Sequence, residues 1–563
     1  MSIKTLSFGD WAVFLFYFII VSLYGWWIYK RKNKSDGTSK GYFLAEGSLT
    51  WWAIGASLIA SNISAEQMVG MSGSGFKMGL AISTYEWMAA ATLVIVAVFF
   101  IPVYLKNKIA TMPQFLHQRY NGTVAMIMAI FWLMLYIVVN LMSILYLGTV
   151  AIAGISGLRF DVVIVALAVF AIFITLGGMK VIGYTDVIQV FFLILGGLAA
   201  TYIALHLISE KAGVTGLWNG FKLLRANAGD HFQMIFKKGN PNYLDLPGIS
   251  VLVGGMWITN LNYWGCNQYI TQRALGADLK TARAGILFAA FLKLLMPVIV
   301  VLPGIAAYAL YQQGMFHHEM LSSKGVLDVN KAYPSVLNLL PDYLKGLSFA
   351  ALTAAIVASL AGKANSIATI FTLDIYKKAI NSKASEKNLV NTGKIAVVVA
   401  MVLGVMLSFV IGDLLMGEGK QGFQYIQEYT GFVSPGIFAM FLLGFFWKKA
   451  TSNAALFATV GGLAFAIVFK FLPYWTNLSF LSPFGFSKLN ADKVWEIPFL
   501  DRMGFVFVIC IVGMYIISMI ENAKGLRTNG LEVDVNMFKT NRSFAIGALV
   551  IAVILTFLYT VFW

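Results

Sequence analysis

The sequence predicts an all-α integral membrane protein with about fourteen transmembrane helices, and three observations support that fold class. First, 59% of the 563 residues are hydrophobic and only 12% are charged, whereas an average soluble protein is about 25% charged. Second, apolar runs of about 20 residues, the length that crosses a bilayer as a helix, recur along the chain. Third, the net charge of +16 comes from short basic clusters between these runs. That distribution is typical of a polytopic membrane protein and not of a nucleic-acid-binding surface.

The order of the apolar runs predicts the topology. The first run, near 9–29, has no small-residue cleavage site after it and is followed by Lys30, Arg31, Lys32 and Lys34. We therefore expect a retained span with the N-terminus outside and the first loop in the cytoplasm. An even number of spans places the C-terminus outside as well. The later runs lie near 50–76, 79–105, 124–155, 161–180, 183–208, 247–272, 284–312, 346–376, 395–415, 424–447, 453–472, 503–521 and 543–562.

The charges of the loops agree with this alternation. The loops expected outside, 209–246 and 313–345, carry mixed charge, whereas cytoplasmic loops should be enriched in Lys and Arg. The basic residues expected on the cytoplasmic side are Lys106, Lys108 and Arg119, then Arg273, Lys280 and Arg283, then Lys377, Lys378, Lys383 and Lys387, and finally Lys448 and Lys449.

Motifs for catalysis or nucleotide binding are missing from the sequence, so we expect neither an enzyme nor an ATP-driven pump. The glycine-rich stretch Gly70–Gly79 lacks the Gly-Lys-Ser/Thr ending of a phosphate-binding loop, and neither HExxH nor GxSxG occurs. Cys266 and Cys510 both lie inside apolar runs, which predicts no disulfide framework.

Polar residues inside two spans indicate a binding site. The middle of the second span, 61–67, reads Ser-Asn-Ile-Ser-Ala-Glu-Gln, a composition that favours leaving the helix. Unwound backbone at mid-membrane can coordinate a cation; the alternative is a helix whose Ser and Asn bond neighbouring helices. The seventh span has a polar stretch from Asn260 to Gln268, five spans later. This spacing predicts two inverted five-helix repeats with the site at their interface.

Two charged residues inside apolar spans are a further signal. Glu86 lies in AISTYEWMAAATL and Lys293 in LFAAFLKLLMPV. A charge at the centre of a spanning helix costs about 2.5–3.5 kcal/mol on insertion scales, so each should face a cavity or a partner. A purely structural Glu–Lys pair is the alternative.

Other polar residues in the spans leave more than one interpretation open. Gln424, Gln427 and Glu428, near the outer start of the eleventh span, fit either a site or an interfacial polar patch. Asn140 and Asp186 fit hydrogen bonds between helices better than ligand binding. Together the amides, one carboxylate, one ammonium and the Tyr and Trp rings suit the hydroxyls and the apolar face of a sugar. This inventory favours a neutral polyol as substrate.

Several stretches match one transporter family in the same order along the chain. They include GASLIASNISAEQMVGMSGSG, STYEWM, YTDVIQVFFLILGG, NLNYWGCNQYITQR, FAAFLKLLMPVIVVLPGIAAY, IATIFTLDIYKK and FQYIQEYTGFVSPGI. Through them the sequence resembles bacterial sodium/galactose–glucose symporters of the solute:sodium symporter family. The resemblance implies the leucine-transporter fold and a multi-pass protein of the bacterial inner membrane. It divides the chain into a first helix and loop (1–49), two inverted repeats (50–208 and 247–447), an extracellular loop between them (209–246) and additional C-terminal helices (448–563).

The same resemblance implies roles for particular residues. The implied sugar ligands are Gln67, Glu86, Asn260, Lys293, Gln427 and the stacked ring of Tyr263. The implied gates are Tyr263 with Asn62 toward the cytoplasm, and Met71, Tyr85 and Phe423 toward the outside. The implied Na⁺ ligands are the carbonyls of Ala60, Ile63 and Ala355 and the hydroxyl of Ser359, with Asp186 on the sodium exit route.

Two positions depart from the family pattern. Ala89 stands where galactose-transporting relatives have a Ser near the sugar, and Ala358 stands where they have the first of two sodium-binding Ser. The second change predicts weakened sodium binding. Lys363 lies four residues after Ser359, so it can approach the same helix face. A protonated amine that replaces the cation is the alternative to weakened coupling.

We therefore expect a symporter in which sodium carries a hexose of the galactose/glucose type inward by alternating access. One alternative is a sodium symporter for another solute, such as myo-inositol or an acidic sugar. A second alternative is a sugar-binding sensor or channel without tight coupling, although no signalling domain is visible in the sequence.

Overall fold

The computed structural model describes residues 6–31, 39–44, 49–322, 325–416 and 421–563. Within them the chain is almost entirely helical, apart from a short antiparallel pair, β1 (Lys488–Leu489) and β2 (Trp495–Glu496), in which Lys488 pairs with Glu496. Lys32 and Lys34, part of the expected first cytoplasmic cluster, lie outside the described residues.

The first half of the chain contains many short or interrupted helices and one uninterrupted helix of 34 residues, α11. In order they are α1 (Phe8–Lys30), α2 (Ser39–Leu44), α3 (Trp51–Asn62), η1 (Glu66–Met71), α4 (Ser72–Met78), η2 (Gly79–Ser83), α5 (Thr84–Ile95), η3 (Val96–Phe100), α6 (Ile101–Lys106), α7 (Met112–Arg119), α8 (Gly122–Met134), η4 (Leu135–Leu141), α9 (Met142–Ser156), α10 (Phe160–Thr175), α11 (Gly178–Lys211), α12 (Leu217–Asn227), η5 (Gly229–Phe232) and η6 (Pro241–Leu244).

The second half has the same character. Its helices are α13 (Ser250–Val253), α14 (Gly255–Cys266), α15 (Gln268–Leu275), α16 (Leu279–Gln312), η7 (Val329–Lys331), α17 (Ala332–Leu337), α18 (Leu344–Thr369), η8 (Ile370–Ile380), α19 (Glu386–Met416), α20 (Gly422–Gly431), α21 (Ser434–Phe446), α22 (Ser452–Leu456), η9 (Phe457–Gly461), α23 (Gly462–Phe471), η10 (Leu472–Tyr474), η11 (Ser479–Phe484), α24 (Phe499–Ala523), η12 (Val535–Phe538) and α25 (Arg542–Val561).

The described residues contain ten helical runs that are long and apolar enough to cross a membrane, or eleven when the bent pair α20–α21 counts as one. Several spanning helices are thus confirmed, and the predicted number is not. Three of the fourteen predicted segments fall outside this set. Segments 50–76 and 247–272 are broken into short helices, and 161–180 contains only the 16-residue α10.

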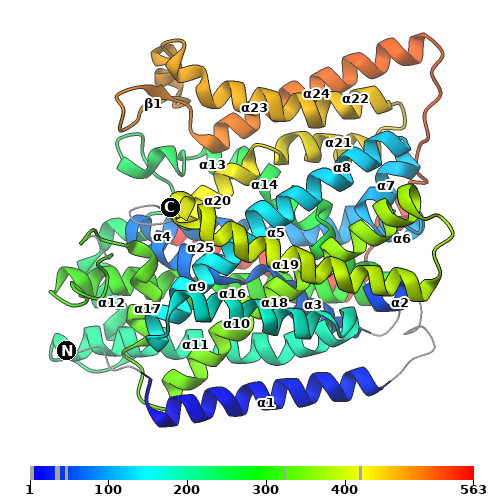
Figure 1. Cartoon of the computed structure of the whole chain (residues 1–563). Coiled ribbons are helices and arrows are strands. Elements are labelled where there is room, and N and C mark those ends of the chain that lie inside the picture. The colour runs from blue at the N-terminus through cyan, green and yellow to red at the C-terminus, as the bar shows by residue number, and fades with distance from the viewer. Residues whose placement is uncertain (1–5, 32–38, 45–48, 323–324, 417–420) are drawn as a thin grey trace.

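The buried centre of the bundle is built by α3, α11, α16 and α18, which pack closely against one another. Their mutual burial explains why polar residues are tolerated there, because a polar side chain inside the bundle finds protein partners instead of lipid. Helix α1 packs on the outside of α11 and α18, and α23 and α24 lie at the opposite edge of the bundle (Figure 1).

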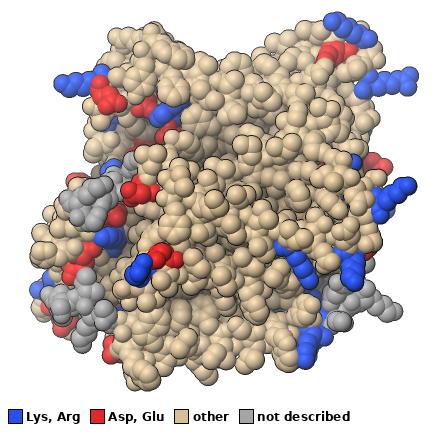
Figure 2. Space-filling model, in the orientation of Figure 1, with Lys and Arg blue, Asp and Glu red and all other residues tan. Residues whose placement is uncertain are grey.

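The surface is apolar over a broad band. Figure 2 shows most of the Lys, Arg, Asp and Glu side chains of this face toward its left and right sides, with other residues between them. Large apolar side chains of α1, α10, α19 and α25 are exposed in this way, as expected for helices that face lipid.

The start of α1 and the end of α25 pack against the two loops that the sequence expects outside. Asp10 accepts hydrogen bonds from the amides of Tyr343 (2.8 Å) and Gly346 (2.9 Å). The amide of Met234 donates to the carbonyl of Phe562 (2.8 Å). The first turn of α1 and the end of α25 therefore lie beside residues of the segments 313–345 and 209–246.

Candidate functional site

A cavity lies in the middle of the bundle, between the two broken helices. Its free volume is about 70 Å³. Side chains from η1, α5, α14, α16 and α20 line it. The lining residues are Asn62, Glu66, Gln67, Tyr85, Glu86, Ala89, Leu135, Asn140, Thr259, Asn260, Asn262, Tyr263, Trp264, Asn267, Tyr269, Lys293, Phe423, Ile426, Gln427, Thr430 and Ile437.

The first break follows α3 and is made by side chains that capture backbone amides. The amide of Ser64 donates to Gln67 Oε1 (3.1 Å) and the amide of Glu66 donates to Ser64 Oγ (3.1 Å). These amides are therefore not used for helical bonds to the residues four positions earlier. Capture of the Ser64 amide frees the carbonyl of Ala60, and within the described residues no backbone amide of the broken segment donates to the carbonyl of Ala60 or Ile63. Such carbonyls are available to a cation.

The second break lies between α14 and α15, at Asn267, whose backbone is extended (φ −97°, ψ 130°). The hydroxyl of Tyr136, from η4, forms hydrogen bonds with two groups at this break. It donates to Asn267 Oδ1 (3.2 Å) and accepts from the amide of Gln268 (3.2 Å). The break is thus held by a helix distant in sequence, so its position could not be read from local residues alone.

Glu86 and Lys293 form a buried ion pair on one wall of the cavity. Lys293 also donates to Asn62 Oδ1, and its ammonium lies 5.2 Å from the centre of the Trp264 ring. Both charged groups therefore have partners in the protein and also face the cavity. The two interpretations of this pair, structural partner and ligand, are compatible in this geometry.

The amides expected to bind substrate are distributed around the cavity. Gln67 comes from η1, Asn260 from α14 and Gln427 from α20. Gln67 is held by Ser64, and Asn260 Nδ2 donates to the carbonyl of Met256 (3.2 Å). The structure therefore brings all the residues expected to contact the sugar to one cavity.

Aromatic residues cover the cavity on two sides. Tyr263 accepts a hydrogen bond from Asn62 Nδ2 (3.0 Å), as the resemblance implied. The rings of Tyr85 and Phe423 meet edge to face at 5.1 Å, and Tyr85 donates to Gln424 Oε1 (3.2 Å). Met71 is fully buried but does not line the cavity.

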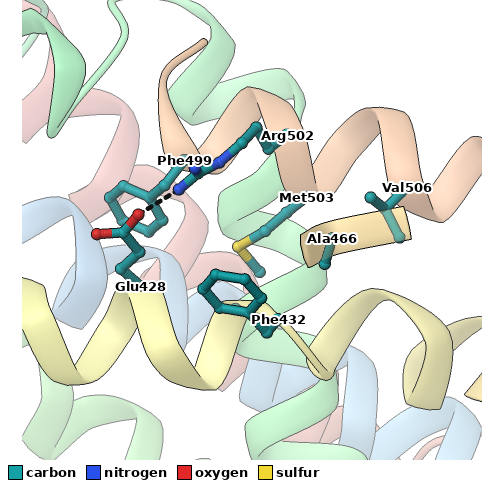
Figure 3. Close-up of a pocket in the computed structure, with 8 residues that line it drawn as sticks. Glu428, Phe432, Ala466, Phe499, Arg502, Met503 and Val506 are labelled. Atoms are coloured by element: carbon teal, nitrogen blue, oxygen red, sulfur yellow. Dashed lines mark hydrogen bonds and ion pairs between the residues drawn. The ribbon is translucent and has the colours of Figure 1, made fainter. Parts of the chain in front are cut away.

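Helix α20, which carries Gln427, is tied to the outer edge of the bundle by an ion-pair cluster. Glu428 pairs with Arg502 of α24 and with Lys470 of α23 (2.7 Å), and Lys470 also pairs with Glu496 (3.2 Å). Figure 3 shows Glu428 pointing toward Arg502, with Phe432 and Met503 packed beneath them. Glu428 does not line the cavity that Gln427 lines. Its ion pairs therefore anchor α20 to α23 and α24.

The residues expected to bind sodium lie where α18 meets the end of α3. Ser359 Oγ donates to the carbonyl of Ser61 (3.0 Å), and Ala355 precedes Ser359 by four residues, on the same face of α18. Ser61 Oγ is buried and has no hydrogen-bond partner. Carbonyl and hydroxyl oxygens are the donors that hard cations prefer, so the residues present fit a sodium ion.

Asp186 lies near this segment, and its partner is a residue that the sequence did not indicate. Ser57 donates to Asp186 Oδ2 (2.5 Å), Arg273 Nε donates to Ser57 Oγ (2.8 Å), and Arg273 Nη2 lies 4.0 Å from Asp186 Oδ2. The sequence placed Arg273 in a basic cluster expected on the cytoplasmic side, and its side chain is fully buried.

Arg119 and Arg283, two other members of the basic clusters expected on the cytoplasmic side, are also buried. Arg119 donates to the carbonyls of Gly444 (2.7 Å) and Ala450 (3.0 Å), and Arg283 donates to those of Ala97 (3.1 Å) and Lys539 (2.8 Å). Guanidinium groups satisfy several carbonyls at helix ends at once, which the linear charge pattern does not reveal.

Several residues that line the cavity were not predicted from the sequence to belong to the site. Glu66 was noted only as part of a polar run, and Asn140 was assigned to helix packing. Thr259, Asn262 and Thr430 gave no distinct signal, although Asn262 belongs to the polar stretch of the seventh span.

A bundle with two broken helices around a polar cavity, and free carbonyls beside a buried hydroxyl, defines a cation-coupled transporter of small polar solutes. The model of the sodium:solute symporter family matches residues 42–462, and the chain belongs to this family. It is 44% identical to the sodium/glucose cotransporter of Vibrio parahaemolyticus, over 99% of each chain. It is 33% identical to the human sodium/myo-inositol cotransporter 2, over 83% of this chain and 70% of the relative.

Among solved structures, a Na⁺-coupled sialic acid symporter in a substrate-bound outward-open state is similar. It is 22% identical, with a TM-score of 0.73, and the match covers 91% of this chain and 98% of that one. The two proteins share their fold.

Proposed function

We propose that this protein carries a neutral hexose of the galactose/glucose type into the cell together with sodium, by alternating access. The observation that supports this most strongly is the single cavity that joins Gln67, Glu86, Asn260, Lys293 and Gln427. Amide, carboxylate and ammonium groups donate and accept hydrogen bonds around a ring of hydroxyls. The Vibrio relative, named as a sodium/glucose cotransporter, supports the same substrate class.

In the proposed site, the sugar lies between these polar groups, and the ring of Tyr263 packs against the apolar face of the sugar. Sugars present apolar C–H faces, and aromatic rings cover such faces well. Tyr263 with Asn62 closes the path toward the cytoplasm, and Tyr85, Phe423 and Met71 close the path toward the outside. Ala89, at the cavity wall, leaves this part of the site without the hydroxyl of galactose-transporting relatives.

Sodium is proposed to bind the carbonyls of Ala60, Ile63 and Ala355 and the hydroxyl of Ser359, and to leave past Asp186. The two carbonyls freed by the first break and the unpartnered hydroxyl of Ser61 support this placement. Because the same break carries Gln67 into the sugar cavity, ion binding and sugar binding order one segment. This shared segment is the physical basis proposed for coupling.

For the membrane arrangement we propose the leucine-transporter fold with fourteen spans. The three segments that are too short or too broken to count by length, 50–76, 161–180 and 247–272, complete this number. Two inverted repeats then occupy 50–208 and 247–447. Residues 1–49 form a first helix and loop, 209–246 the outer loop and 448–563 the added helices. Both termini lie outside the inner membrane of a bacterium.

The test is uptake of labelled sugars into proteoliposomes under an inward sodium gradient. Galactose and glucose should accumulate, whereas accumulation of myo-inositol or an acidic sugar alone would support the alternative solutes. Binding of sugar without sodium-driven accumulation would identify a sensor or channel. Replacing sodium by choline should abolish uptake.

A further inference from the structure

Lys363 is a buried cation beside the oxygens proposed to bind sodium. It lies on α18, one turn after Ser359, and 1% of its surface is exposed. Its Nζ donates to Ser359 Oγ (3.3 Å), and the same hydroxyl donates to the carbonyl of Ser61 at the end of α3 (3.0 Å). The ammonium and a sodium ion would thus use the same hydroxyl oxygen.

The charges buried around the cavity and this segment balance without sodium. They are three acids and three bases, namely Glu66, Glu86, Asp186, Arg273, Lys293 and Lys363. Glu86 pairs with Lys293, and Arg273 lies 4.0 Å from Asp186. The remaining charges are those of Glu66 and Lys363. A sodium ion entering this arrangement therefore adds an uncompensated positive charge, which is costly in a buried site.

Glu66 has no direct ion pair in the described part of the chain. One of its oxygens accepts a hydrogen bond from Ser143 (2.5 Å). Without Lys363, a sodium ion at the end of α3 would be the counter-charge for Glu66. Lys363 already supplies that charge.

Close packing keeps the lysine near the site. At Gly362, an added Cβ would lie 2.8 Å from Ser61 Oγ and 2.5 Å from Arg273 Nη2, so α18 and α3 touch at this level. The ammonium also lies 4.9 Å from the centre of the Tyr269 ring. The face of that ring offers a place for the ammonium when its contact with Ser359 is lost.

We propose that Lys363 is a tethered cation that stands in for sodium. Its ammonium holds Ser359 and balances Glu66 when no ion is bound, and sodium must displace it toward Tyr269. This inference rests on the proposed function, because it concerns the sodium site of the transporter. The buried ammonium of Lys363 would then weaken sodium binding in addition to the hydroxyl that is missing at Ala358.

The test is sodium binding to the purified protein in detergent, without sugar, read as the rise of the melting temperature with NaCl at constant ionic strength with choline chloride. Lys363→Met removes the charge and leaves an unbranched side chain only one atom shorter. It should lower the apparent Kd for sodium at least about tenfold, or about 1.4 kcal/mol. The matched control is Lys383→Met, which removes an exposed charge of the loop after η8 and should leave the Kd unchanged.

A second set of variants keeps the test sharp if Lys363→Met does not fold. Lys363→Gln retains a hydrogen-bond donor and should also tighten sodium binding. Glu66→Gln should weaken it by a similar factor, and the double variant Glu66→Gln/Lys363→Met should return it toward the wild-type value. An apparent Kd in Lys363→Met or Lys363→Gln that equals or exceeds that of the wild type overturns the proposal.

The outcomes separate this proposal from the proposed function. Sodium-driven sugar uptake by the wild type together with an unchanged Kd in the Lys363 variants would overturn only the role of Lys363. Sodium binding that appears only after Lys363 is replaced would support the tethered cation and contradict sodium coupling in the natural protein. If neither the wild type nor any Lys363 variant binds sodium, both the role of Lys363 and the proposed sodium coupling are overturned.

Discussion

Removal of Lys293 tests whether the buried ion pair with Glu86 serves the substrate or only the fold. Lys293 also donates to Asn62, so one side chain links α16 to α5 and to the end of α3. Lys293→Ala leaves the carboxylate of Glu86 buried without its partner. Breaking a buried pair in this way costs about 3–5 kcal/mol of stability. The single variant is therefore a poor measure of sugar binding by itself.

The informative variant is Glu86→Gln/Lys293→Met, which removes both charges and nearly retains the volume. Replacing both partners of a buried pair is close to neutral for stability. Each lost hydrogen bond between a sugar hydroxyl and a charged group weakens binding by about 1.5–3 kcal/mol, or about 10- to 150-fold in Kd. With two such groups lost, sugar binding should disappear while the melting temperature stays near that of the wild type.

Equilibrium binding of labelled sugar to the purified protein in saturating sodium measures this directly. A matched control is Asp374→Asn/Lys378→Met, which removes an ion pair of η8 that does not line the cavity and should leave the sugar Kd unchanged. If Glu86→Gln/Lys293→Met folds and binds sugar with the wild-type Kd, the pair is structural and the assignment of the site is wrong.

Three further predictions concern the gate, the ion site and the outer loop. Tyr263→Phe loses the hydrogen bond from Asn62 but keeps the ring, so the rate of uptake should fall more than sugar affinity; equal losses of both would reduce Tyr263 to an ordinary ligand. Ala358→Ser should tighten sodium binding about tenfold if the new oxygen contributes ~1.4 kcal/mol, and Ser359→Ala should remove sodium dependence; uptake that follows a proton gradient in both would contradict the sodium site. Burial raises the pKa of Asp245, in the segment 209–246, to about 6. Since this raised pKa favours the neutral acid in the folded protein, its stabilisation is complete below about pH 4 and is lost as the pH rises through about 6. The melting temperature should therefore fall between about pH 4 and pH 6, and Asp245→Asn should flatten that part of the curve; an unchanged curve would contradict it.

The sequence was most informative about polar residues inside apolar spans. Gln67, Glu86, Asn260 and Lys293 stand out because a polar or charged group facing lipid is costly, so its presence in a span implies a cavity or a partner. This argument needs only composition and position. It brought out residues that the structure gathers around one cavity, although it could not distinguish an ion pair from a pair of ligands.

The basic residues show what the linear charge pattern leaves undecided. Arg119, Arg273 and Arg283 look like cytoplasmic charges in sequence, but each is buried against carbonyls or an acid from a distant helix. Lys and Arg near a span end are ambiguous, because the same side chain can reach water or cap the ends of neighbouring helices. Only packing decides between the two.

The amino-acid sequence by itself determined that this chain is helical, crosses a membrane several times, belongs with sodium-coupled sugar symporters and is interrupted near residues 61–67 and 260–268. The helices, the spans and the interruptions follow from hydrophobicity and local backbone preference, which act over a few turns, whereas the family follows from the resemblance of several stretches in the same order. The tertiary structure decided which groups meet. Ser359 reaches the carbonyl of Ser61 across 298 positions, and Lys293 reaches Glu86 across 207. Such contacts depend on how helices far apart in the chain pack, because burial makes each charge seek whichever partner the bundle places beside it.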